Sequence, residues 1–127
     1  TSMFAIAQAK RGFVPDIGTT YLLPRIVGLA RAMELMLLAQ PIDAKTALAY
    51  GLINRIAAPD AVLTEAIAMA KQILTLPEPA VRWVKRVTYF NLDATFEQAL
   101  NTETMAESIL AGTPDFTKAL AAFMSKK

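Results

Sequence analysis

The sequence of 127 residues contains neither cysteine nor histidine. Without these side chains the chain can build no disulfide framework, no Cys/His zinc site, no Ser-His-Asp triad and no Cys-His pair. Any acid–base chemistry that these residues carry must therefore use carboxylates, lysine or tyrosine. The absence of cysteine also favours a cytoplasmic location, where disulfides are rare.

Long apolar runs and blocks of like charge are also missing. Charged residues interrupt every apolar stretch before the roughly 18 residues of a membrane span, and the first residues lack a signal-peptide pattern. The net charge is only +2 and gives no indication of nucleic-acid binding. Apolar residues, in contrast, make up 54% of the sequence against 19% charged residues. We therefore expect apolar surface that another copy or a further part of the protein covers.

Helical patterns dominate the sequence, and the predicted fold class is mostly α with two short strands. Strands are expected at residues 3–6 and 52–57. We expect Asp43 and Asp93 to cap helices at their N-termini and Gly51 to end one at its C-terminus. Pro24 and Gly28 are expected to break the first helical stretch. The predicted helices span residues 22–27, 29–39, 44–50, 60–74, 80–90, 94–110 and 115–124.

Residues 12–18 combine several turn-forming side chains around one acid. Pro15 fixes one φ angle and Gly18 permits a backbone conformation that other residues resist. Thr19 and Thr20 can then cap the start of the following helix. Asp16, between these residues, has two possible roles: a carboxylate aimed at a ligand, or a further cap for the same helix.

Several segments have the order and spacing found in one enzyme family. They are Leu-Leu-Pro-Arg-Ile-Val-Gly at 22–28, Ala-Arg-Ala-Met-Glu-Leu at 30–35, the start of the helix at 44–47, Gly-Leu-Ile-Asn at 51–54 and Phe-Met-Ser-Lys at 123–126. Together they resemble the C-terminal half of the crotonase (enoyl-CoA hydratase/isomerase) superfamily, whose members are roughly twice as long. The resemblance implies the last turn of a ββα spiral in residues 1–57, followed by a helical trimerisation region in residues 58–127. It also implies a homotrimer or a dimer of trimers.

The resemblance further implies an acyl-CoA substrate, with coenzyme A as part of the thioester and no permanently bound cofactor or metal. Family members with an acid directly after the proline, as in Pro15-Asp16, resemble the enoyl-CoA isomerases, in which this acid moves a proton from C2 to C4. Hydratases carry a glutamate where this sequence has Gln8. Because an amide is neither a general acid nor a general base near neutral pH, water addition by two glutamates is not expected.

Other site residues follow from the same resemblance. The substrate is expected to contact Gln8, Phe13, Ile17, Tyr21 and Leu22. The nucleotide part of coenzyme A is expected at Lys126 and at an aromatic residue, Phe116 or Phe123. The family's oxyanion-hole donors align before Thr1, so we expect these 127 residues alone to be inactive.

Besides an enoyl-CoA isomerase, the sequence is compatible with three other functions. Within the enzyme class they are an acyl-CoA hydratase and an aryl-CoA dehalogenase-like enzyme, in which Asp16 is a nucleophile. Outside that class, the chain is a non-catalytic helical oligomerisation module.

Overall fold

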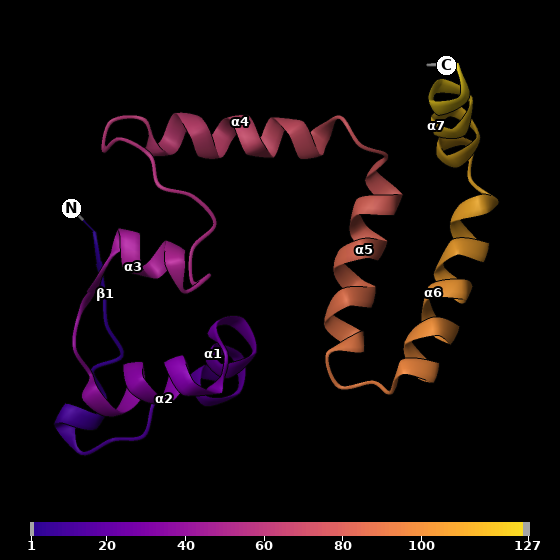
Figure 1. Cartoon of the computed structure of the whole chain (residues 1–127). Coiled ribbons are helices and arrows are strands. Elements are labelled where there is room, and N and C mark those ends of the chain that lie inside the picture. Colours follow the sequence, from indigo (N-terminus) through magenta and orange to yellow (C-terminus); the bar gives the residue numbers. More distant parts are fainter. Residues whose placement is uncertain (1, 126–127) are drawn as a thin grey trace. The chain divides into compact units, whose positions relative to one another are not determined.

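The computed structural model describes residues 2–125, which form two compact units (Figure 1). The N-terminal unit covers residues 1–65 and the C-terminal unit covers residues 66–127. Over the described residues, helices predominate and two strands of two residues each form one small sheet, which confirms the predicted fold class. None of the helices in residues 2–125 is long and apolar enough to cross a membrane.

The sheet joins the start of the N-terminal unit to its middle. Strand β1 (Met3–Phe4) pairs antiparallel with β2 (Ile42–Asp43), so that Met3 lies opposite Asp43. The first predicted strand is thus confirmed in a shorter form, whereas the strand predicted at 52–57 is wrong. Those residues follow α3 (Ala44–Ala49), and the Leu52 N–H closes the end of that helix by donating to the Ala47 carbonyl at 2.9 Å. Gly51, at φ +75°, permits this closure, as expected.

Two helices form the core of the N-terminal unit. Helix α1 (Thr19–Val27) and α2 (Leu29–Leu38) pack against each other on either side of Gly28, whose φ is +82°. Gly28 separates the two helices as predicted, but Pro24 does not break α1, which starts earlier than expected. The buried side chains of the core belong to Leu23, Val27, Ala32, Leu35 and Met36.

The 3-10 helix η1 (Ala9–Arg11) precedes the turn that contains Asp16. On the other side of α2, Asp43 caps α3 as expected, because its side chain accepts a hydrogen bond from the Thr46 N–H at 2.8 Å. Along the chain, these two connections flank the α1–α2 pair, and Ile42, Tyr50 and Leu52 pack against its core.

The C-terminal unit contains most of α4 (Val62–Leu74), followed by α5 (Glu78–Asn91), α6 (Phe96–Ala111) and α7 (Pro114–Met124). Helices α5 and α6 lie side by side (Figure 1). The predicted cap Asp93 is wrong. The N-cap of α6 is Thr95, which forms a capping box with Gln98: the Gln98 N–H donates to Thr95 Oγ1 at 3.2 Å and the Thr95 N–H to Gln98 Oε1 at 2.9 Å.

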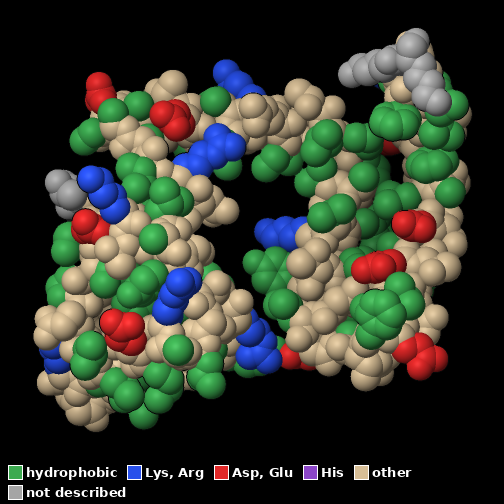
Figure 2. All heavy atoms as spheres, viewed as in Figure 1, with side chains coloured by type: hydrophobic (Ala, Val, Ile, Leu, Met, Phe, Trp, Pro, Cys, Tyr) green, Lys and Arg blue, Asp and Glu red, His purple; other side chains and the backbone are tan. Residues whose placement is uncertain are grey.

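Large apolar side chains of the C-terminal unit remain exposed. Ala106 is the only buried hydrophobic residue in the part of α4–α7 that the structure describes. The hydrophobic side chains are visible over α5 and α6 in Figure 2. The most exposed are those of Leu74, Phe96 and Phe123. Four amphipathic helices with so little buried surface are typical of a region that packs against further protein.

Candidate active site

Asp16 starts a tight turn that leads directly into α1. Its carbonyl oxygen accepts two hydrogen bonds from Thr19, one from the backbone N–H at 3.0 Å and one from Oγ1 at 2.7 Å. The two residues between them, Ile17 and Gly18, both have positive φ angles, +54° and +77°. A hydrogen bond from the N–H of residue i+3 to the carbonyl of residue i, around two residues with positive φ, is the pattern of a type I′ turn. We call residues 15–19 the Asp16 turn.

Ile17 is an unusual residue for this conformation. Left-handed backbone is disfavoured for β-branched side chains, and type I′ turns are normally built from Gly, Asn or Asp. The Ile17 side chain is 95% exposed, so contacts within this chain do not offset the cost. Backbone strain of this kind concentrates at functional sites, where the shape of the turn matters more than its stability.

The Asp16 carboxylate does not cap α1. The N-cap is Gly18, which makes no side-chain capping bond, and Thr19 and Thr20 lie inside the helix rather than before it. The capping role considered for Asp16, Thr19 and Thr20 is therefore wrong. Instead, Asp16 Oδ1 accepts a hydrogen bond from Gln8 Nε2 at 3.4 Å. The Asp16 side chain is exposed and remains available to a ligand.

Gln8 is half-buried and belongs to the turn that carries η1. Its backbone carbonyl accepts hydrogen bonds from the Arg11 N–H at 2.9 Å and from the Phe13 N–H at 3.1 Å. Because a carboxylate can only accept, the contact with Asp16 requires the amide nitrogen of Gln8 to face it. The sequence predicted both residues as site residues but not their contact, since eight positions and two turns separate them.

The other residues predicted to contact substrate lie close in sequence to Asp16 and are exposed. Phe13 precedes the turn, with 68% of its surface exposed. Tyr21 and Leu22 belong to the first turn of α1 and are partly exposed. The Arg25 guanidinium lies over the Tyr21 ring, 3.5 Å from its centre, so one face of that ring already has a cationic neighbour.

The residues predicted to bind the nucleotide of coenzyme A belong to the C-terminal unit. Phe116 lies near the start of α7 and Phe123 near its end, and both are exposed. Lys126 lies outside the described residues. In residues 2–125, no three Asp or Glu side chains gather closely enough to hold a metal ion.

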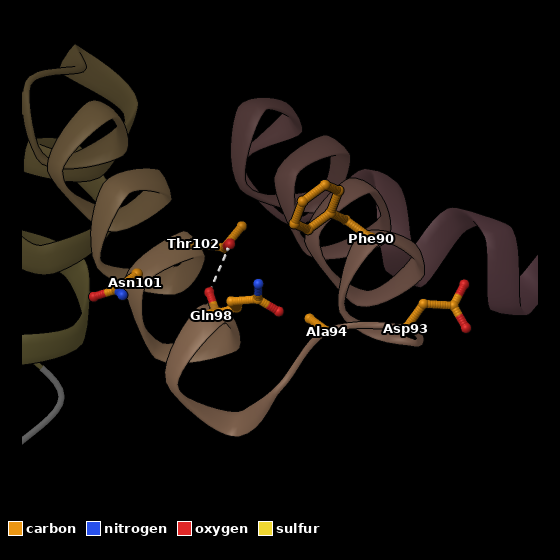
Figure 3. Close-up of a pocket in the computed structure, with 6 residues that line it drawn as sticks. All are labelled: Phe90, Asp93, Ala94, Gln98, Asn101 and Thr102. Atoms are coloured by element: carbon orange, nitrogen blue, oxygen red, sulfur yellow. Dashed lines mark hydrogen bonds between the residues drawn. The ribbon is translucent and has the colours of Figure 1, made fainter.

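A hollow of about 420 Å³ that the sequence did not predict lies where α5 meets α6 (Figure 3). Phe90 supplies its apolar wall, and Thr102 Oγ1 donates to the Gln98 carbonyl at 2.8 Å on its other side. Its lining consists of Phe90, Asp93, Ala94, Gln98, Asn101 and Thr102. Only one acid is among them, so the hollow offers no pair of groups for acid–base catalysis.

Comparisons with known proteins identify relatives of this chain. The family model for enoyl-CoA hydratase/isomerase matches residues 1–127. A "Probable enoyl-CoA hydratase" of Rhizobium meliloti (strain 1021) is 33% identical over the whole chain, which spans 49% of that relative. The 1,2-epoxyphenylacetyl-CoA isomerase of Escherichia coli (strain K12) is 28% identical over the whole chain, which covers 48% of that protein.

The same fold occurs in solved structures. The crystal structure of enoyl-CoA hydratase from Bacillus anthracis superimposes on the whole chain with a TM-score of 0.95 and 27% identity, and the chain covers 49% of it. The chain therefore belongs to the enoyl-CoA hydratase/isomerase family, the crotonase superfamily. It spans about half the length of the curated relatives it matches.

Proposed function

We propose that the complete protein isomerises an enoyl-CoA thioester and that Asp16 is its proton-shuttling base. The observation that carries the proposal is the position of the Asp16 carboxylate. It lies exposed on a strained turn, does not cap α1 and contacts an amide. A carboxylate in this position can take a proton from C2 of a thioester and return it at C4, provided that both carbons are within hydrogen-bond reach.

Hydration is the second candidate because the Rhizobium meliloti relative has a name that indicates a hydratase. Gln8 argues against it, since its amide can bind a water molecule but cannot remove or deliver a proton near neutral pH. A nucleophilic Asp16, as in aryl-CoA dehalogenation, is ranked last because no aromatic cage for an aryl group is evident in this sequence.

Coenzyme A enters this proposal only as part of the substrate, with Phe116, Phe123 and Lys126 as its nucleotide contacts. We also propose that residues 58–127 form the oligomerisation region of a homotrimer or a dimer of trimers. The exposed apolar side chains of α4–α7 support that assignment. Light scattering on the complete protein tests it: a stable monomer at micromolar concentration would contradict it.

The test of the catalytic role is Asp16→Asn in the complete protein. The substitution keeps the size of the side chain but removes the base, so we expect kcat for a 3-enoyl-CoA to fall by roughly 10²–10⁴ with the fold intact. Asp60→Asn, an exposed acid outside the site, is the matched control and is expected to keep native kcat. Native kcat for Asp16→Asn would rule out Asp16 as the base. Water addition to a 2-enoyl-CoA, measured on the native protein, decides between isomerase and hydratase.

A further inference from the structure

We propose that Gln8 is a positioning residue that selects which oxygen of Asp16 acts as the base. The inference rests on the catalytic role proposed for Asp16. Gln8 Nε2 donates to Asp16 Oδ1, so Oδ1 is held by the protein and Oδ2 is left for the substrate. Gln8 thereby acts through Asp16 rather than as an acid, a base or a substrate contact of its own.

Both partners of this contact are held by their own backbone. The carbonyl of Gln8 accepts hydrogen bonds from Arg11 and Phe13, which fixes the residue at the start of η1. The carbonyl of Asp16 accepts two hydrogen bonds from Thr19 at the start of α1. The amide and the carboxylate therefore come from two separately anchored turns, and their hydrogen bond links the side chains of these turns.

A proton shuttle has a particular need for such a contact. The carboxylate must release its proton to C4 from a geometry close to that in which it took one from C2, and small misplacements reduce rates strongly. A free carboxylate rotates about its bond to Cβ and exchanges its two oxygens. A donor on Oδ1 restricts that rotation without occupying Oδ2.

An amide suits this task better than a second acid. The amide N–H₂ group donates in every protonation state of Asp16, whereas a glutamate at the same place would compete for the proton. The distance of 3.4 Å is at the long end for such a bond. Catalytic hydrogen bonds often have this length in the absence of substrate and tighten in the substrate complex.

The test compares Gln8→Met and Gln8→Glu in the complete protein, with a 3-enoyl-CoA as substrate. Methionine keeps the length of the side chain but cannot donate, so we expect kcat to fall about 10- to 100-fold with KM within about twofold of native. Glutamate carries a carboxylate, which near neutral pH only accepts hydrogen bonds, so we expect kcat of Gln8→Glu to fall by a similar factor.

Gln40→Met, at an exposed glutamine outside the site, is the matched control and is expected to keep native kcat and KM. Native kcat for Gln8→Met, or a rise in KM at native kcat, would overturn the positioning role. If Gln8→Met does not fold, Gln8→Glu decides, because its carboxylate cannot donate to Asp16, and native kcat in that variant would overturn the role equally.

Asp16→Asn separates this inference from the function on which it rests. If Asp16→Asn is inactive while Gln8→Met is native, Asp16 is the base and Gln8 does not position it. If Asp16→Asn keeps native kcat, both proposals fail.

Discussion

Thr19 donates two hydrogen bonds to a single atom, the carbonyl oxygen of Asp16, from its backbone at 3.0 Å and from its hydroxyl at 2.7 Å. The candidate base and the first residue of α1 are thereby joined across the turn. A substitution at Thr19 should therefore affect the backbone position of Asp16 while leaving its carboxylate chemically unchanged.

Thr19→Val removes the hydroxyl bond and preserves the shape of the side chain. We expect the free energy of unfolding to fall by about 1 kcal/mol, the usual net contribution of one such bond. Thr20→Val, at the exposed next position in the same helix, is the control and should change stability much less. Urea denaturation of both variants measures the difference. Equal losses would show that the helix responds to valine in general and not to the missing bond.

Ile17→Asn should stabilise the chain, although it replaces an apolar side chain with a polar one. Left-handed backbone costs an ordinary residue roughly 1–2 kcal/mol, and asparagine adopts it more readily. Because Ile17 is 95% exposed, little packing is lost, and we expect a gain of about 1 kcal/mol. Val14→Asn is the control, since Val14 is also exposed but has no positive φ. A loss of stability in Ile17→Asn would indicate that Ile17 packs against protein outside residues 2–125.

Asp43 should make stability depend on pH. The backbone N–H of Thr46, which donates to the carboxylate, holds the pKa of Asp43 below its usual value of 3.8. A lowered pKa means that the unfolded state binds the proton more readily, so this stabilisation is present above pH 3.8 and is lost as the pH falls through the folded pKa. Asp43→Asn keeps a capping oxygen but does not titrate. Thermal melts from pH 6 to pH 2 should show the advantage of the native protein over this variant shrinking below about pH 4.

Thr95→Ala should destabilise α6. It removes the side chain that caps the Gln98 N–H, which typically costs about 1 kcal/mol. Thr104→Ala is a matched control because Thr104 lies inside the same helix, where alanine is the better helix former. Helix content and chemical denaturation of the complete protein provide the measurement. A Thr95→Ala variant as stable as the control would show that the capping box contributes little.

Local patterns predicted the fold where one residue determines the outcome. Asp43 and Gly51 were identified as the ends of α3 because capping chemistry depends on a side chain or a φ angle at one position. Asp93 was predicted as the cap of α6, whereas the N-cap is Thr95; both residue types are good caps, and only the reciprocal bond to Gln98 distinguishes them. The strand predicted at 52–57 is wrong. The prediction rested on β-branched residues, and their presence does not determine which carbonyl groups accept hydrogen bonds from the backbone N–H groups.

The candidate site was predicted residue by residue, but its geometry was not. Proline, glycine and the family resemblance identified Asp16, and the same resemblance identified Gln8 by its departure from glutamate. The type I′ turn was hidden because Ile17 is a residue that local rules exclude from left-handed backbone. The bond between Gln8 and Asp16 depends on two turns together, which no single-residue preference encodes.

Trp83 is the only tryptophan of the chain, and it lies half-buried on α5 with the Arg86 guanidinium 5.2 Å from its ring centre. Its intrinsic fluorescence therefore originates in the C-terminal unit, whereas the Asp16 turn belongs to the N-terminal unit. The tyrosine nearest to that turn in the sequence is Tyr21, beneath Arg25. Tryptophan emission will therefore follow the melting of α5, and events at the Asp16 turn must be followed through tyrosine or an introduced tryptophan.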